Sequence, residues 1–399
     1  MIRFCLYVLL LSAVFSCRPV AILPTTAPST RRTEPLPPNK LVIGAEQLPV
    51  MLPQLAGKRV GLVVNRTSFV GKTHLADSLK SLGINIVRIF GPEHGFRGNA
   101  ADGEIVNDSL DVKTGIPIVS LYGKTKKPTA KQLSDIDVMV FDIQDVGARF
   151  YTYIGTMHYV MEACAENKKK LIILDRPNPN AFVDGPMNEK PLQSFVAMHA
   201  IPMTHGMTVG ELARMINGEG WLAGKVQCEI EIIPLKNWKH DDAYALPIGP
   251  SPNLPNNQAI RLYPSICLFE GTVISLGRGT PFPFQALGSP ELKTMSFQFT
   301  PVTIKGVAVN PPQENKLCYG IDLRNVPVER RIDLKYLLMI YNAYPDKEKF
   351  FIPYFDILAG TPTLKQQIKS GLTEEQIRAS WKPELDAFKI KREKYLLYQ

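Results

Sequence analysis

Short apolar runs alternate with longer amphipathic stretches along the first half of this chain. The runs cover residues 59–64, 84–90, 118–121, 138–143 and 171–174. Between them, helical patterns cover residues 73–82, beginning at a Thr N-cap, and residues 152–167. Alternation of strands and helices at this spacing predicts an α/β fold, in which helices cover both faces of a doubly wound parallel sheet.

Each of these predicted strands is followed directly by polar residues. The polar endings are Asn65-Arg66, Glu93-His94, Tyr122, Asp142 to Asp145, and Asp175-Arg176. In open parallel sheets, ligands bind in the crevice beyond the carboxyl ends of the strands. The sequence therefore predicts a continuous polar crevice at that edge.

The segment 91–98, GPEHGFRG, has the densest chemistry of these endings. It sets Glu93, His94 and Arg97 in a glycine-rich loop just beyond the predicted strand 84–90. A surface loop whose glycines serve a turn is the plain alternative, since loop carboxylates are usually only solvated. The imidazole and guanidinium close to Glu93 favour a functional site.

A second cluster covers residues 141–153, FDIQDVGARFYTY. It holds Asp142, Asp145, Arg149, Tyr151 and Tyr153. Sugar-binding sites use this mixture, with charged groups for the hydroxyls and aromatic faces for the apolar side of a pyranose ring. The alternative is structural, with Asp145 starting the next helix and the tyrosines packed in the core.

Missing motifs limit the cofactors that this fold could use. No G-x-G-x-x-G follows the first strand, where Gly61 lies inside the run and Gly71 stands alone. The segment 71–73 ends like a phosphate loop, but Arg66 occupies the position of its first glycine. We therefore expect no nucleotide cofactor.

Cysteine spacing and charge exclude further classes. Cys164, Cys228, Cys267 and Cys318 are scattered singly, which is typical of small core residues and not of a metal site. We therefore expect no metal. The formal net charge is +9, and the basic residues are spread without an aromatic-interleaved stripe, so nucleic-acid binding is disfavoured.

The amino terminus has the pattern of an export signal. Arg3 precedes an apolar run over residues 4–15, which is too short to span a bilayer. The segment 14–17, VFSC, resembles the bacterial lipoprotein box, with Cys17 as the lipidated residue. A plain cleaved signal is the alternative. We expect a signal peptide over 1–16, a lipidated, proline-rich tether over 17–40, and a lipid-anchored protein of the bacterial cell envelope.

The pattern changes after DRPNP at 175–179, where Pro and Gly punctuate shorter elements. We place a first domain over 41–180 and a second over 181–399. The second contains HGMT at 205–208, beginning a helix to Asn217, then GPSPNLP at 249–255, FEGT at 269–272 and GRGT at 277–280. Rigid polar loops of this composition usually line or brace a site.

Taken together, GPEHGFRG, FDIQDVGARFYTY, DRPNP, HGMT, GPSPNLP and FEGT with GRGT resemble the exo-acting β-N-acetylmuramidase family of the NamZ type, over about residues 41–399. The resemblance implies release of a non-reducing terminal N-acetylmuramic acid from small peptidoglycan fragments in cell-wall turnover. It also implies a Rossmann-like lobe, a smaller α+β auxiliary lobe and an active-site cleft between them. Glu93 matches the family's catalytic glutamate, and Glu270 matches the glutamate of FEGT. Residues 279–284 depart from the pattern, since many relatives carry an extra Thr-Arg there.

Glycoside hydrolysis generally needs one carboxyl group to protonate the leaving oxygen and a second group to attack or to activate water. Glu93 is the expected acid, and His94 next to it could tune or relay the proton. The second group is left open among Asp142, Asp145 and Glu270.

Substrate binding would draw on the neighbouring polar side chains. The lactyl carboxylate of muramic acid suits a guanidinium fork, although each candidate arginine could instead brace a loop. The expected substrate-binding residues are Arg97, Asp145, Arg149, Tyr151, Tyr153, Asn178, His205, Asn253 and Arg278.

Two other functions compete with the glycosidase. Glu93, His94, Asp142 and Asp145 could hold a hard metal for phosphoester hydrolysis, which a chelator would abolish. A non-catalytic glycan-binding lipoprotein would bind sugar without turnover.

Overall fold

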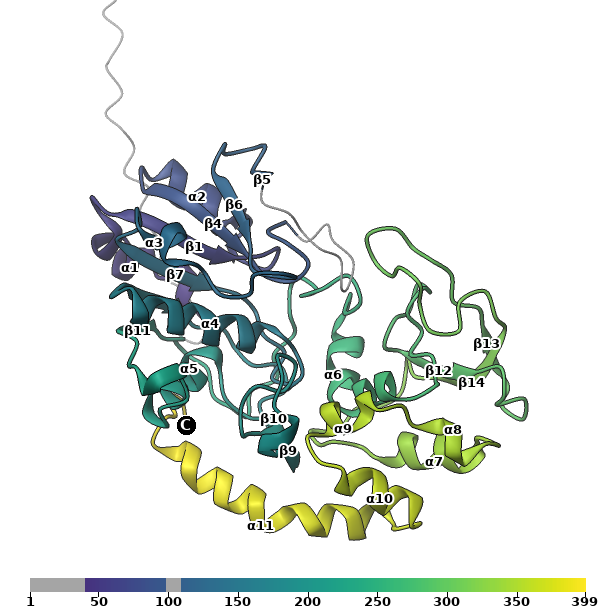
Figure 1. Ribbon diagram of the computed structural model, residues 1–399. Coiled ribbons are helices and arrows are strands. Elements are labelled where there is room, and N and C mark those ends of the chain that lie inside the picture. The colour runs from purple at the N-terminus through teal and green to yellow at the C-terminus, as the bar shows by residue number, and fades with distance from the viewer. Residues whose placement is uncertain (1–39, 98–108) are drawn as a thin grey trace, which may run out of the picture. The chain divides into compact units, whose positions relative to one another are not determined.

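A seven-stranded sheet organises the first half of the part of the chain that the computed structural model describes, residues 40–97 and 109–399 (Figure 1). Its order is β11-β8-β7-β1-β4-β6-β5, and every pairing is parallel except that of β5 with β6. In sequence order the strands are β1 (Arg59–Val64), β4 (Asn85–Gly91), β5 (Ser109–Leu110), β6 (Pro117–Ser120), β7 (Val138–Asp142), β8 (Lys170–Leu174) and β11 (Ile230–Ile233). The predicted signal peptide, Cys17 and all of the tether before Lys40 lie outside the described residues.

The predicted parallel strands and α/β class are confirmed, with boundaries shifted by a residue or so. The sheet also continues past residue 180, where we placed the end of the first domain, because β11 pairs with β8 at its edge. This strand is only four residues long. Such a short run within a Pro- and Gly-rich stretch gives little periodic signal.

Helices cover both faces of the sheet, as the doubly wound pattern requires. On one face α1 (Leu48–Leu55) and α2 (Leu75–Ser81) pack against Val60, Leu62 and Val64 of β1. On the other face α4 (Tyr153–Glu166) and α5 (Val209–Gly218) share a core with Val63 of the same strand. The alternation of residues 60 to 64 between two cores is the two-residue period of a strand buried on both sides. The short α3 (Ala130–Leu133) joins the second core through Leu133.

The first predicted helix begins later than we expected. Thr73–His74 forms β3, which pairs with β2 (Phe69–Val70) in a small antiparallel ladder. The N-cap of α2 is therefore His74, whose Nδ1 accepts a hydrogen bond from the Ala76 amide at 3.2 Å. The Thr N-cap prediction at residue 73 is wrong, because the ladder takes that residue.

From residue 183 onward, apart from α5 and β11, the chain forms mostly smaller elements, which are called the second half below. Its antiparallel three-stranded sheet has the order β12-β14-β13, and a hairpin joins β9 to β10. These strands are β9 (Val183–Met187), β10 (Pro202–His205), β12 (Ala286–Ser289), β13 (Phe297–Phe299) and β14 (Cys318–Asp322). The helices are α6 (Asn257–Ile266), η4 (Cys267–Gly271), α7 (Lys335–Ala343), α8 (Lys347–Phe350), α9 (Tyr354–Ala359) and α10 (Thr363–Lys369); the other short 3-10 helices of the chain are η1 (Gly44–Glu46), η2 (Lys190–Leu192) and η3 (Ala223–Lys225). A mixed α+β second part is what the family resemblance implies.

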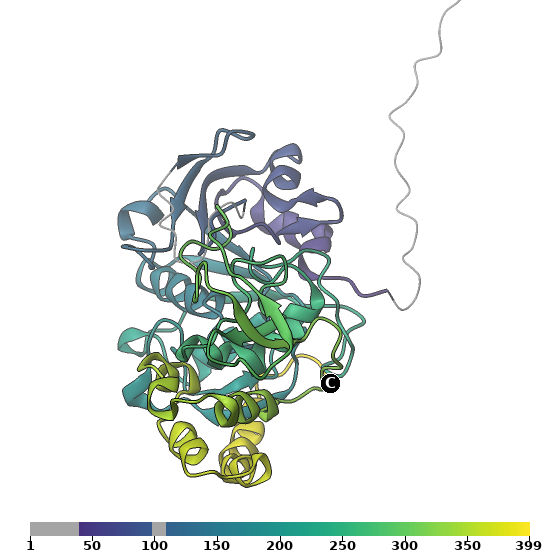
Figure 2. The ribbon, with the colours of Figure 1, turned by 90° about the vertical axis from the view of Figure 1, so that its right-hand side faces the viewer.

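The last helix, α11 (Glu374–Glu393), carries the chain from α10 back to the first half (Figures 1 and 2). Beyond it, the Leu397 amide donates to Glu211 Oε1 at 2.7 Å, and the Tyr398 hydroxyl donates to Asp175 Oδ2 at 2.6 Å. The C-terminus is thus fastened to the end of β8 and the start of α5. Across residues 40–97 and 109–399, no helix combines the length and apolar character needed to span a membrane.

The four scattered cysteines at positions 164, 228, 267 and 318 are all buried, free thiols. The neighbouring Cys228 thiol, together with burial, raises the pKa of the Cys164 thiol well above its ordinary value. These cysteines are core residues, as their scattered spacing indicates.

Candidate active site

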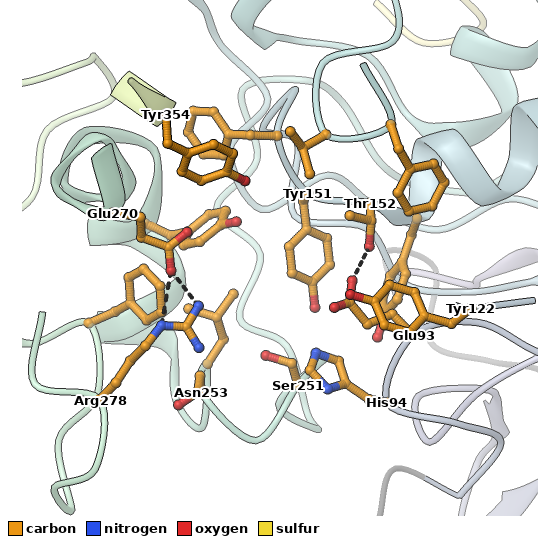
Figure 3. Close-up of a pocket in the computed structure, with 17 residues that line it drawn as sticks. Glu93, His94, Tyr122, Tyr151, Thr152, Ser251, Asn253, Glu270, Arg278 and Tyr354 are labelled. Atoms are coloured by element: carbon orange, nitrogen blue, oxygen red, sulfur yellow. Dashed lines mark hydrogen bonds and ion pairs between the residues drawn. The ribbon is translucent and has the colours of Figure 1, made fainter. Parts of the chain in front are cut away.

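A pocket of about 190 Å³ opens at the carboxyl edge of the sheet and is closed by loops of the second half (Figure 3). The sheet supplies the residues that follow β4, β6 and β7, and the second half supplies η4 and the loops around it. The pocket is lined by Glu93, His94, Tyr122, Phe150, Tyr151, Thr152, Tyr153, Phe195, Val196, Ser251, Asn253, Leu254, Tyr263, Glu270, Arg278, Phe284 and Tyr354.

Glu93 stands on one wall, two residues beyond β4. The Thr152 hydroxyl donates a 2.7 Å hydrogen bond to Glu93 Oε2, and Thr152 is itself the N-cap residue of α4 (Figure 3). The carboxyl group is therefore held between a strand end and a helix start, both fixed by the core. Only 7% of Glu93 is exposed.

His94 adopts a backbone conformation that is unusual for its residue type. Its φ is +67°, in the left-handed region that L-residues other than glycine rarely occupy, and Gly95 follows with φ +73°. The Gly95 amide closes this turn on the Pro92 carbonyl at 2.9 Å. Such backbone strain gathers at functional sites, where the surrounding structure holds it in place.

Glu270 stands on the opposite wall, in η4 (Figure 3). Arg278 donates to its Oε1 through both Nε, at 2.9 Å, and Nη2. The next residue, Gly271, lets α9 approach, since a Cβ there would lie 2.3 Å from the Phe355 Cα. The Arg278 guanidinium also lies over the Phe284 ring, 4.9 Å from its centroid. Glu270 therefore presents an ion-paired carboxylate to the pocket.

Aromatic rings and buried polar atoms form the remainder of the lining. The Tyr151 and Tyr153 rings meet edge to face at 4.7 Å, and burial raises the pKa of both hydroxyls, so they stay neutral donors. Asn253 donates from Nδ2 to the Val307 carbonyl at 2.9 Å. Its Oδ1 is buried without a hydrogen-bond partner in the described residues. An orphaned acceptor of this kind suits a ligand hydroxyl or amide.

Asp142 lies at the same sheet edge but does not line this pocket, although the sequence made it a catalytic candidate. Arg176 donates to Asp142 Oδ1 at 2.6 Å from Nε and to Oδ2 at 2.9 Å from Nη2. Asp142 is fully buried and Arg176 nearly so. This bidentate pair engages both oxygens of the carboxylate inside the fold.

Asp145 is also outside the pocket lining; its contacts lie within the fold, but it does not start α4, whose N-cap residue is Thr152. Its Oδ2 accepts the Gly147 amide at 2.6 Å, which fixes the turn that leads into 148–152. Burial raises the pKa of Asp145 to about 7.

Two of the candidate arginines are engaged elsewhere. Arg97 forms a bidentate pair with Asp111, at 2.9 and 2.8 Å, and reaches Asp77 at 3.4 Å. Arg149 is buried and donates to four carbonyls, those of Pro186, Ile201, Leu358 and Ala359. Burial without a carboxylate lowers the pKa of Arg149 to about 9. Of the three candidates, only Arg278 lines the pocket.

Asn178 and His205 are likewise used within the fold. Asn178 donates from Nδ2 to the Met207 carbonyl at 2.9 Å, and its Oδ1 accepts the Asn180 amide at 2.8 Å. His205 Nδ1 accepts the Met207 amide at 3.2 Å, and burial lowers the pKa of its imidazole to about 3. Neither lines the pocket.

Several lining residues were not candidates from the sequence. Phe150, Thr152, Ser251 and Leu254 lie inside motifs that the sequence singled out, and Tyr122 is one of the polar strand endings, so closer reading could have found them. Aromatics such as Phe195 and Tyr354 had no such signal, because nothing local marks them. The added residues are Tyr122, Phe150, Thr152, Phe195, Val196, Ser251, Leu254, Tyr263, Phe284 and Tyr354.

Two glutamates on opposite walls of an aromatic pocket supply the pair of carboxyl groups that glycoside hydrolysis uses, so the site fits a glycosidase. The comparisons with known proteins give its family. The model of the exo-β-N-acetylmuramidase NamZ N-terminal domain matches residues 60–258, and the model of its C-terminal domain matches residues 261–398. The chain belongs to the NamZ exo-β-N-acetylmuramidase family.

Individual relatives agree with this assignment. The peptidoglycan β-N-acetylmuramidase NamZ of Bacillus subtilis (strain 168) is 39% identical over 376 residues, which cover 88% of this chain and 89% of that protein. Two crystal structures of DUF1343 family proteins from Bacteroides fragilis are similar to the structure of this chain. One has 48% identity, a TM-score of 0.84 and coverage of 90% of this chain and 99% of the other; the second has 31% identity, a TM-score of 0.75 and coverage of 91% and 100%.

Proposed function

We propose that the protein is an exo-acting glycosidase that releases non-reducing terminal N-acetylmuramic acid from peptidoglycan fragments. Both family models and the Bacillus relative support this activity. The observation that carries the proposal is the placement of Glu93, held by Thr152, across one pocket from the Glu270–Arg278 pair.

Glu93 is the proposed general acid. The Thr152 hydroxyl orients its carboxyl group, so that a proton can pass to the leaving glycosidic oxygen. His94, in the same strained turn and the same pocket lining as Glu93, is the proposed group to tune or relay that proton. Burial of both side chains keeps bulk water away from the reacting bond.

Glu270 is the proposed second carboxylate, to attack the anomeric carbon or to activate water. Among the three candidates, Asp142 is engaged by Arg176 and Asp145 by the Gly147 amide, whereas Glu270 lines the pocket. Arg278 is the arginine available to a lactyl carboxylate, which it would meet while still bound to Glu270.

Pocket size supports removal of one terminal residue. The cavity of about 190 Å³ is below the range of ~300–1,000 Å³ that drug-sized ligands occupy, so it suits one sugar ring and not a chain. The Tyr151 and Tyr263 rings, 5.7 Å apart and nearly perpendicular, offer apolar surface to that ring.

Release of the chromophore from a chromogenic N-acetylmuramide tests the proposal, with the N-acetylglucosaminide and the Glu93→Gln variant as controls. Turnover of the muramide alone, resistant to chelator and lost in the variant, is the expected result. Saturable binding without turnover would point instead to a glycan-binding lipoprotein. Chelator-sensitive phosphoester hydrolysis would point to the metal-dependent alternative, which Asp142 supports poorly because Arg176 engages both of its oxygens.

We infer further that the chain is exported and anchored in the cell envelope by a lipid on Cys17. The charged start, the apolar run over 4–15 and the VFSC segment support this. Expression of Cys17→Ser next to the unchanged chain tests it. The variant should lose incorporation of labelled fatty acid and leave the membrane fraction, and equal labelling of both chains would contradict the inference.

A further inference from the structure

A second cavity adjoins the catalytic pocket on one side. It measures about 390 Å³ and is lined by Tyr122, Gly123, Lys126, Ser194, Phe195, Val196, Tyr354 and Ile357. Tyr122, Phe195, Val196 and Tyr354 also line the catalytic pocket, so these four residues form a shared wall. A third cavity, of about 370 Å³, continues from Ser194 and Phe195 to Trp221. The pocket therefore leads into a larger groove.

One end of the shared wall, at Tyr122, lies on the Glu93 side of the pocket. Glu93 follows β4 and Tyr122 follows β6, and these strands are parallel neighbours in which Gly91 pairs with Ser120. The Leu121 amide also donates to the Gly91 carbonyl at 2.8 Å, so the two strand ends leave the sheet together. Figure 3 places Glu270 and Arg278 on the far side of the pocket, with Tyr354, another residue of the shared wall, near Glu270.

The position of the proposed acid indicates which part of the substrate would lie in the groove. A general acid protonates the oxygen that leaves, so the leaving part of the substrate lies on the side of the acid. With Glu93 in that role, the terminal sugar occupies the catalytic pocket and the leaving saccharide extends past Tyr122 into the groove.

Lys126 gives the groove a positive charge. Its ammonium lies over the Phe195 ring, 4.8 Å from the centroid, and makes no ion pair with a carboxylate of the described residues. The next residue, Lys127, differs, because it bonds Glu162 and Glu166 at 2.7 Å each. Among the described residues, no carboxylate therefore neutralises the charge of Lys126.

We propose that this groove binds the leaving saccharide and that Lys126 binds the carboxylate of the muramic acid within it. The inference rests on the proposed function. Peptidoglycan glycans alternate N-acetylmuramic acid with N-acetylglucosamine, so the first leaving sugar is neutral and the second carries a lactyl carboxylate. A cation set one cavity away from the acid, next to an aromatic ring, fits that order.

Peptide-free oligosaccharides test the assignment. The full-length protein is assayed on MurNAc-GlcNAc, whose leaving part is neutral, and on MurNAc-GlcNAc-MurNAc, whose leaving part is anionic. Lys126→Met keeps an unbranched apolar stem over Phe195 and removes the charge. It should raise the KM for the trisaccharide relative to that for the disaccharide by about threefold to fivefold, the scale of a partly exposed charge pair.

Lys124→Met is the matched control, since Lys124 is an exposed lysine of the same loop that does not line the groove. It should leave the ratio of the two KM values as in the unchanged protein. Equal changes of both KM values in Lys126→Met, or no change in either, would overturn the inference. Failure of the proposed function is distinct, because the unchanged protein would then release no chromophore from the chromogenic muramide.

Discussion

Two groups of polar side chains occupy the carboxyl edge of the same sheet, and they differ in what they contact. One group, with Glu93, His94 and Thr152, faces the pocket. In the other group, Asp142 and Arg176 bind each other inside the fold and do not line the pocket. Burial hardly separates them, since Glu93 is 7% exposed and Asp142 is fully buried.

The difference between these groups is the use of their hydrogen-bonding capacity. Both oxygens of Asp142 accept from one guanidinium inside the fold, so the pair stabilises the junction of β7 and β8. Glu93 is oriented by a hydroxyl and presented to a cavity. Position at a sheet edge thus marks candidates for a site, and the partners of each side chain separate carboxylates that face a pocket from carboxylates that are paired within the fold.

The sharpest test of this contrast is Glu93→Gln. The amide keeps the size of the side chain and can still accept from Thr152, so we expect an unchanged melting temperature. Loss of the acid should lower kcat on the chromogenic muramide by about 10²- to 10⁴-fold. A variant that retains more than a tenth of the activity would remove Glu93 from the proposed chemistry.

Asp142→Ala should give the opposite result. It leaves the buried Arg176 guanidinium without its partner, which costs about 3–5 kcal/mol of the free energy of unfolding. Urea denaturation measures that loss, and kcat per folded molecule at low temperature should stay close to the unchanged value. A stable but inactive Asp142→Ala would move this residue into the catalytic group.

Asp145, a third carboxyl group at this sheet edge, should make the stability of the protein depend on pH. Burial raises the pKa of Asp145 from about 3.8 to about 7, so the native protein holds a proton that the unfolded chain releases near pH 4. Because the native state binds more protons than the unfolded chain in this range, the free energy of unfolding falls as pH rises from about 4 to about 7. Asp145→Asn keeps an oxygen acceptor for the Gly147 amide but does not titrate.

The variant should therefore be more stable than the unchanged protein at pH 8, by about 2–4 kcal/mol, and similar to it at pH 4. Unfolding curves in urea at both pH values measure the difference. Parallel stability profiles for the two proteins across this range would show that Asp145 is ionised in the native state throughout.

The sequence predicted the sheet well, because continuous apolar runs containing Val and Ile, such as 60–64 and 171–174, carry the signal of strands buried on both faces. It also singled out Glu93, which follows such a strand directly and lines the pocket in the structure. The pairing of Asp142 could not be predicted from the sequence. Its partner Arg176 is 34 residues away; Asp142 ends β7 and Arg176 follows β8, so the local pattern makes both look like site residues.

Contacts between distant segments also explain why Arg149, expected to bind substrate, is engaged within the fold and why Tyr354 was missed as a lining residue. Two of the carbonyls that hold Arg149 belong to Leu358 and Ala359, more than two hundred residues later in the chain. Tyr354 reaches the pocket because α9 packs on Gly271 of η4. Packing of distant segments decides both outcomes, and no periodicity near either residue reports it.

Thr152→Val has the smallest expected effect and tests how Glu93 is held. Thr152 is the N-cap residue of α4 but makes no side-chain capping bond, so the replacement should leave the unfolding free energy nearly unchanged. Loss of its hydroxyl should lower kcat by about tenfold, the scale of one hydrogen bond to a charged group, without a matching rise in KM. Thr208→Val is the matched control, because Thr208 caps α5 and bonds Asp175, so it should lower stability and spare kcat. Equal loss of kcat in both variants would mean that general loosening of the fold, and not the orientation of Glu93, limits the reaction.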